Sequence, residues 1–125
     1  MKLTPVLIVD EIESLLPFWI DRIGFANNGQ VPEGDAIGFI MLGKGNAELM
    51  IQSRASVAKD EPAFLPVPGA AAVSLFIEVD DFEDILQRLE GYPVAMAERT
   101  TFYGMREIGV RDPSGTVVIF AKPTV

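Results

Sequence analysis

Glu48, Tyr103 and Arg106 are the side chains of this sequence that could take part in acid–base or polar chemistry. Glu48 could act as a general base, and Tyr103 or Arg106 could stabilise negative charge that develops on a substrate. Arg106 could also recognise a carboxylate through parallel hydrogen bonds from its planar guanidinium. The chain has no histidine and no cysteine, so histidine catalysis, thiolate chemistry and disulfides are excluded. The plainer alternative is a solvated Glu48 and a surface cation at Arg106.

Strand alternation decides which side chains accompany Glu48. We expect Ala36–Leu42 and Ala47–Ser53 to form antiparallel strands joined by a short turn. Successive strand residues point to opposite faces, so Leu49 and Ile51 would cover a helix and Glu48 would lie on the other face. The other candidate ligand contacts on these strands, for which core packing is the alternative, are Phe39, Met41, Met50 and Gln52.

The stretch from Tyr103 to Phe120 predicts a β-hairpin. Pro113 fixes φ at the second residue of a turn, Asp112 can hydrogen-bond the backbone ahead of it, and Gly115 can close the turn without steric cost. The two arms are rich in Val, Ile and Phe, which is typical of well-covered strands. These arms are Glu107–Arg111 and Thr116–Ala121.

The start of the chain predicts a strand and then a helix. Leu3–Val9 is rich in β-forming residues, and Asp10 is a suitable helix cap. Apolar residues then recur at helical spacing until Gly24, which supplies the stop. We expect Phe25–Gly34 to form a short irregular strand and a loop.

The second half of the chain repeats this order. Val73–Val79 predicts a strand, Asp80 a cap, and Phe82–Leu89 an amphipathic helix. Pro93–Glu98 can form a short strand before the final hairpin. Between the halves, Arg54–Ala70 contains three prolines and little periodicity, so we expect a linker that passes over the surface.

A shift of 70 residues brings the two halves into register. The matching pairs are Thr4 with Ser74, Val9 with Val79, Asp10 with Asp80, Glu13 with Glu83, and Gly45 with Gly115. The repeat predicts one α+β domain built from two βαβββ units, residues 1–53 and 71–125, joined by the linker 54–70. Each unit would carry a helix on one face of a curved mixed sheet, and the uncovered faces would meet around a cleft.

Composition narrows the class of protein. The net charge is -8, which repels phosphate backbones and argues against a nucleic-acid partner. No apolar run is long enough to span a membrane. The start of the sequence leads directly into a strand and not into a signal peptide, so we expect a soluble cytoplasmic protein.

Two stretches carry a family resemblance. The first is Thr4-Pro-Val-Leu-Ile-Val-Asp10 followed by Phe18-Trp-Ile-Asp-Arg-Ile-Gly-Phe25, and the second is Tyr103-Gly-Met-Arg-Glu107 running on into Arg111-Asp-Pro-Ser-Gly115. In these stretches the chain resembles the vicinal oxygen chelate superfamily, which includes glyoxalase I, extradiol dioxygenases, fosfomycin resistance enzymes and bleomycin resistance proteins. The resemblance covers nearly the whole chain and implies the glyoxalase/bleomycin resistance fold.

The resemblance also implies where a metal would be bound. The four ligand positions of the metal enzymes would fall on Thr4, on Glu48 or Leu49, on Ser74 and on Ile119. Strand alternation favours Glu48 over Leu49. One carboxylate and two hydroxyls do not provide three strong ligands. We therefore expect neither a metal nor another cofactor.

Three classes of function remain. The first, which we favour over a lyase or a dioxygenase, is a protein that holds or sequesters a partly apolar or cationic small molecule, like the bleomycin resistance branch with its role in antibiotic resistance. The second is a metal-free lyase or isomerase with Glu48 as general base, and the third is a dimeric scaffold or regulatory module. A homodimer is expected, as is common in the family. The expected ligand contacts are Phe39, Met41, Glu48, Met50, Gln52, Phe76, Tyr103, Arg106 and Ile119.

Overall fold

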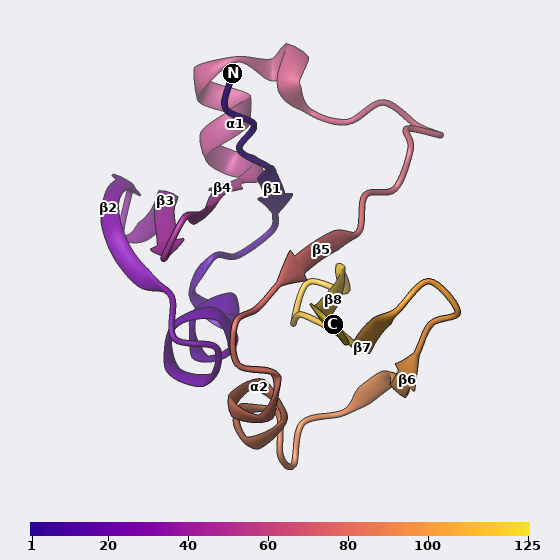
Figure 1. Cartoon of the computed structure of the whole chain (residues 1–125). Helices are drawn as coiled ribbons and strands as arrows, with labels where there is room; N and C mark the ends of the chain where they lie inside the picture. The colour runs from indigo at the N-terminus through magenta and orange to yellow at the C-terminus, as the bar shows by residue number, and fades with distance from the viewer. The chain divides into compact units, whose positions relative to one another are not determined.

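Two four-stranded mixed sheets form the framework of the structure, one in each half of the chain (Figure 1). The computed structural model describes residues 1–125 and divides into two units, Met1–Ala71 and Ala72–Val125. Each unit follows the order βαβββ that the sequence repeat predicts. The predicted α+β class is therefore confirmed.

The sheet of the first unit has the strand order β1-β4-β3-β2. Its strands are β1 (Val6–Val9), β2 (Ala26–Glu33), β3 (Ala36–Lys44) and β4 (Ala47–Ser53). Strand β1 runs parallel to β4, and the other neighbours are antiparallel. Register shifts interrupt β2, so the irregular strand predicted for this segment is confirmed, but the predicted loop was wrong because β2 extends to Glu33.

Alternation along β3 and β4 separates a buried face from a partly exposed one. The side chains of Ile40, Leu42, Leu49 and Ile51 share the buried face. Trp19 completes this core, with its ring edge-to-face against the rings of Phe18 and Phe25. Burial of this apolar face is the main source of stability for the first unit.

The single helix predicted after β1 is instead two short helical segments, η1 (Glu13–Leu15) and η2 (Pro17–Arg22). Pro17 has no backbone N–H and opens η2, which has the wide turn of a π-helix. The Ile23 N–H donates to Phe18 O at 2.9 Å. The predicted cap was also wrong, because Asp10 caps nothing and forms an ion pair with Arg54 at 3.1 Å.

The segment Arg54–Ala70 was predicted to be an irregular linker, and this was wrong for its first half. Helix α1 (Arg54–Asp60) follows β4 directly, and η3 (Pro62–Phe64) comes after it. The Ser53 hydroxyl caps α1 by accepting a hydrogen bond from Ser56 N at 3.1 Å, and Val57 anchors the helix with a fully buried side chain. The prolines all lie beyond α1, and seven residues are too few to show a clear helical period.

The sheet of the second unit has the strand order β5-β8-β7-β6. Its elements are β5 (Leu75–Glu78), α2 (Phe82–Arg88), β6 (Val94–Thr100), β7 (Met105–Arg111) and β8 (Val117–Pro123). Strand β5 is parallel to β8, and the other pairs are antiparallel. One face of the sheet is buried with the apolar side of α2. Its side chains are Ile108, Val110, Val118 and Phe120, and those of α2 are Phe82 and Ile85.

The residue that caps α2 is Asp81, and the prediction of Asp80 was wrong by one position. Asp81 Oδ1 accepts a hydrogen bond from Asp84 N at 3.0 Å. Asp80 contributes a backbone carbonyl instead, which accepts from the Lys122 ammonium. None of the helices in the chain is long and apolar enough to cross a bilayer.

The hairpin predicted between β7 and β8 is confirmed. Asp112 is buried, and its Oδ1 accepts from Ser114 N at 2.9 Å and from Thr116 N at 3.1 Å. Gly115 N closes the turn by donating to Asp112 O at 2.9 Å, with φ of 92° at Gly115. Such a φ is adopted readily only by glycine.

Candidate functional site

The partly exposed face of the first sheet carries most of the predicted ligand contacts. We call this surface the first open face. Its residues on the three strands β1, β3 and β4 are Val6, Ile8, Phe39, Met41, Gly43, Glu48, Met50 and Gln52. The sequence assigned Glu48, Met50 and Gln52 to the face opposite Leu49 and Ile51, and the register confirms that assignment.

The centre of the first open face is apolar. Met50 lies between Val6 on one neighbouring strand and Met41 on the other, and Phe39 lies opposite Gln52. Met50, Met41 and Phe39 are half-buried, whereas the apolar residues of the opposite face are buried. Flexible, polarizable methionines in such a position can adapt to a bound molecule.

Glu48 is the carboxylate of the first open face. Its Oε2 lies 2.5 Å from Lys2 Nζ, and the two side chains are 32% and 68% exposed. The pair thus has solvent access, and Lys2 occupies the position that a cationic ligand would take. Glu48 is partly solvated, as one interpretation of the sequence expects. It also lies beside the apolar centre, as the other interpretation expects.

Asn28 is a polar neighbour of Glu48 that the sequence did not reveal. A Cβ built on Gly43 would lie 2.5 Å from Asn28 Nδ2, so the Asn28 amide covers the place where Gly43 has no side chain. Gly43 is the direct cross-strand partner of Glu48. The register shift between Asn27 and Gly29 places Asn28 here, and sequence alternation does not foresee such a bulge.

Gln52 marks the other polar end of the first open face. Its Nε2 donates to Ser56 Oγ at 3.1 Å, and this bond links β4 to the first turn of α1. The amide oxygen of Gln52 can still accept a hydrogen bond. The first open face therefore has a carboxylate at one end, an amide at the other and an apolar centre.

The second sheet also has a face directed away from the buried one, and we call it the second open face. Two rows cross it. The first row is Phe76, Ile119, Gly109 and Met96, and the second is Glu78, Ala121, Glu107 and Arg99. Phe76 and Ile119 were predicted ligand contacts, and the register makes them direct neighbours. Phe76 is 51% exposed.

Glu107 is the most deeply buried charged residue of the second open face. It is 2% exposed, and its Oε1 accepts from Arg99 Nε at 3.1 Å and Arg99 Nη2 at 3.0 Å. Site prediction from the sequence missed Glu107. The available signal was a carboxylate next to the apolar stretch Ile108–Val110 of the hairpin arm. A carboxylate that is buried in such a strand needs a partner.

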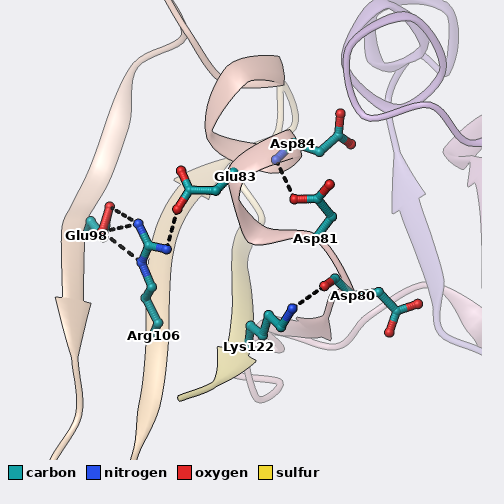
Figure 2. Close-up of polar contacts among 7 residues, drawn as sticks. All are labelled: Asp80, Asp81, Glu83, Asp84, Glu98, Arg106 and Lys122. Carbon is teal, nitrogen blue, oxygen red and sulfur yellow. Dashed lines mark hydrogen bonds and ion pairs between the residues drawn. The ribbon is translucent and has the colours of Figure 1, made fainter. Parts of the chain in front are cut away.

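Arg106, a predicted ligand contact, lies on the opposite side of the same strand. Figure 2 shows its guanidinium between Glu83 and Glu98. Nη1 lies 2.5 Å from Glu83 Oε1, Nε donates to Glu98 Oε2 at 3.1 Å, and the Arg106 Cζ lies 4.6 Å from the centre of the Phe82 ring. The hydrogen bond to Glu83 raises the pKa of Arg106, and Glu98 adds to this effect. Arg106 thus ties α2 and β6 to β7.

A cavity of about 340 Å³ lies beside this ion pair. Its wall consists of Asp81, Phe82, Glu83, Arg106, Lys122, Pro123 and Thr124. Glu83 pairs with Arg106, Asp81 caps α2, and Lys122 donates to the Asp80 carbonyl (Figure 2). Each charged side chain of this cavity thus already has a partner within the second unit.

Tyr103 lies in the connection between β6 and β7 and on neither open face. Its ring is 60% exposed and stands edge-to-face against Phe102, with 5.1 Å between the ring centres. Gly104 follows with φ of 85°. The structure therefore places Tyr103 and Arg106 apart from the remaining predicted contacts of the second unit.

The four positions implied for a metal do not provide a suitable set of ligands. Thr4 and Ser74 offer hydroxyls, Ile119 offers no donor, and Glu48 is bound to Lys2. When the halves are aligned on Leu7 and Ile77, Ile119 corresponds to Met50 and not to Glu48. No group of three or more acidic side chains forms a possible metal site.

Comparison with known proteins places this geometry in a family. The family model described as "Glyoxalase/Bleomycin resistance protein/Dioxygenase superfamily" matches residues 3–120. No curated protein sequence matches the chain.

Several solved structures share the fold. TioX from Micromonospora sp. ML1 has a TM-score of 0.79 at 17% identity, with 98% of each chain covered. Lactoylglutathione lyase from Agrobacterium tumefaciens has a TM-score of 0.73 at 19% identity, with 98% of this chain and 92% of the other covered. A bleomycin-binding protein in complex with bleomycin has a TM-score of 0.67 at 20% identity, with 98% of each chain covered.

Proposed function

The chain belongs to the Glyoxalase/Bleomycin resistance protein/Dioxygenase superfamily, and we propose that it binds a partly apolar, cationic small molecule without a metal. The ligand lies on the first open face, with its cationic group on Glu48 and its apolar part on Met41 and Met50. We also propose that the protein is cytoplasmic and acts as a homodimer. Light scattering at micromolar concentration tests the oligomeric state.

The first open face carries this proposal. Half-buried Phe39, Met41 and Met50 form an apolar surface with one carboxylate at its edge. Small-molecule sites usually combine an apolar lining with a few polar groups that set orientation. Glu48 is only partly exposed, so its carboxylate is more stable with a cationic partner. A ligand cation that replaces Lys2 provides this partner.

One structural neighbour has a small molecule bound. The bleomycin-binding protein is described in complex with bleomycin. At 20% identity, the similarity between the two proteins extends to the fold alone. The acidic balance of the present chain, with a net charge of -8, adds a general preference for cations.

The alternative of a metal-free lyase or isomerase has less support. Such an enzyme would use Glu48 as general base, with Tyr103 or Arg106 to stabilise charge. Arg106 is bound by Glu83 and Glu98 on the face that α2 covers, and the Tyr103 ring lies in an exposed loop. Arg106 is therefore already engaged by two carboxylates of its own unit.

The proposal is tested by a thermal-shift screen of apolar organic cations followed by titration of the hits. Replacement of Glu48 by Gln keeps the size of the side chain and removes its charge. We expect Glu48→Gln to weaken binding by about 1–3 kcal/mol, the cost of a lost charge-assisted hydrogen bond. Equal affinities for the wild type and the variant would reject the role of Glu48.

Glu33→Gln is the matched control for this titration. Glu33 is also a carboxylate of the first sheet, and it pairs with Lys59 at 3.0 Å. It is not part of the first open face. Its replacement removes the same charge and should leave ligand affinity unchanged.

A further inference from the structure

Two side chains of β6 cover two neighbouring positions of β7 on the second open face. Met96 lies over Gly109, with its Cβ 3.0 Å and its Cε 3.6 Å from the place that a Cβ on Gly109 would occupy. Arg99 lies on Glu107, with Nη2 3.0 Å from Oε1. The apolar side chain of Met96 thus covers Gly109, and beside it the cationic side chain of Arg99 covers the Glu107 carboxylate.

The covering groups are more exposed than the groups that they cover. Glu107 and Gly109 are buried, and Glu107 is 2% exposed. The side chain of Arg99 is 55% exposed, and Met96 is half-buried. Arg99 and Met96 are already partly solvated and can move into solvent, and the buried Glu107 carboxylate then needs a new cationic partner.

Strand β6 is suited to such a movement. It is an edge strand, and its register with β7 shifts between Val94 and Met96 and again between Met96 and Arg99. The covering side chains thus belong to the least regular pairing of this sheet. Methionine adds a flexible side chain that tolerates several arrangements.

We propose that Glu107 and Gly109 form a binding site for an apolar amidinium or guanidinium compound, and that Arg99 and Met96 occupy this site in the free protein. The planar fork of an amidinium matches the carboxylate of Glu107, as the guanidinium of Arg99 does. The apolar part of the compound takes the place of Met96 over Gly109, beside Ile119. The inference rests on the proposed small-molecule binding but assigns a different carboxylate.

Occupation of the site by Arg99 and Met96 predicts how a change at Arg99 alters the affinity for the amidinium compound. A ligand can bind only the fraction of molecules in which Arg99 has left Glu107, so its apparent affinity is reduced by that fraction. Removal of the Arg99 cation must then increase affinity for the amidinium compound. An ion pair that never opens predicts instead that the wild type does not bind the amidinium compound at all.

The experiment uses benzamidine as probe, with isothermal titration calorimetry on the folded full-length chain. We expect Arg99→Gln to bind benzamidine about tenfold more tightly than the wild type, and Arg99→Gln/Glu107→Gln to lose the gain. Arg88→Gln is the control, because Arg88 pairs with Asp84 on α2 at 2.8 Å and carries the same charge. Its affinity for benzamidine should equal that of the wild type.

Neutral benzamide keeps the inference testable if the double variant does not fold. It has nearly the same shape as benzamidine but no charge, so Arg99→Gln should show no gain in affinity for it. Equal benzamidine affinities of the wild type and Arg99→Gln would overturn the inference. A benzamidine affinity that falls in Glu48→Gln and does not change in Arg99→Gln would also overturn it, while the function proposed for the first open face would stand.

Discussion

Lys2 Nζ lies 2.5 Å from Glu48 Oε2, so a residue near the start of the chain neutralises the carboxylate of the first open face. The two side chains are 68% and 32% exposed. Exposed pairs of this kind contribute about 0–1 kcal/mol to stability, because water and salt screen the attraction. The pair matters more as a competitor of a cationic ligand than as a structural link.

The first prediction concerns Lys2→Gln. The change leaves Glu48 without its competing cation, so affinity for a cationic ligand of the first open face should rise several-fold, while the free energy of unfolding should change by less than about 1 kcal/mol. Titration and urea unfolding measure the two effects. Lys59→Gln, which breaks the pair with Glu33, is the control and should not alter affinity. Weaker binding by Lys2→Gln would mean that Lys2 itself contacts the ligand.

A second prediction distinguishes the two candidate caps of α2. Asp81→Ala removes the acceptor for Asp84 N and should lower the free energy of unfolding by about 0.5–2 kcal/mol. Asp80→Ala keeps the carbonyl that binds Lys122 and should cost less than about 0.5 kcal/mol. Urea unfolding of both variants is the measurement. Equal costs would show that the Asp81 cap adds nothing specific.

A third prediction concerns the turn of the final hairpin. Asp112→Ala removes the acceptor of two backbone N–H groups, those of Ser114 and Thr116, and should cost about 1–3 kcal/mol. Ser114→Ala loses hydroxyl bonds to Asp112 at 2.6 Å and to Thr116 Oγ1 at 3.2 Å but leaves both backbone N–H groups paired, and it should cost less. Thermal unfolding followed by circular dichroism compares the two variants. The reverse order of stability would contradict this account of the turn.

A fourth prediction compares two glycines of β3. A Cβ on Gly38 would lie 2.8 Å from Glu33 Cβ and 3.1 Å from Ser56 Cβ, and neither atom can move without its backbone. Gly38→Ala should therefore cost about 1–3 kcal/mol. A Cβ on Gly43 would clash with the end of the flexible Asn28 side chain and otherwise make an ordinary contact with Ala47 O at 3.7 Å, so Gly43→Ala should be nearly neutral. Soluble expression and urea unfolding test the two variants, and equal stabilities would show that Glu33 and Ser56 do not exclude a side chain at position 38.

Alternation and turn chemistry were sufficient to predict most of the fold. Strand β4 and the hairpin around Asp112 lie where the sequence places them, because both carry strong local signals. The π-helix at Pro17–Arg22 and the short α1 were missed. Their conformation depends on the missing N–H of Pro17 and on the burial of a single residue, Val57, and periodicity reveals neither.

The candidate site was predictable only where a regular strand carries it. Glu48 and Met50 were assigned to their face because β4 has no bulge. Asn28 and Arg99 depend on register shifts in β2 and β6, which alternation along one strand cannot foresee. Arg106 shares a face with Ile108, so it contacts α2 and lies on the side of β7 opposite to the second open face.

The placement of the aromatic residues gives each unit its own optical signal. Trp19 is the only tryptophan, and it is buried between Phe18 and Phe25 in the first unit. Both tyrosines, Tyr92 and Tyr103, belong to the second unit. Fluorescence excited selectively at tryptophan therefore follows the unfolding of the first unit, and tyrosine emission reports on the second. Coincident transitions would show that the two halves unfold cooperatively, without any added label.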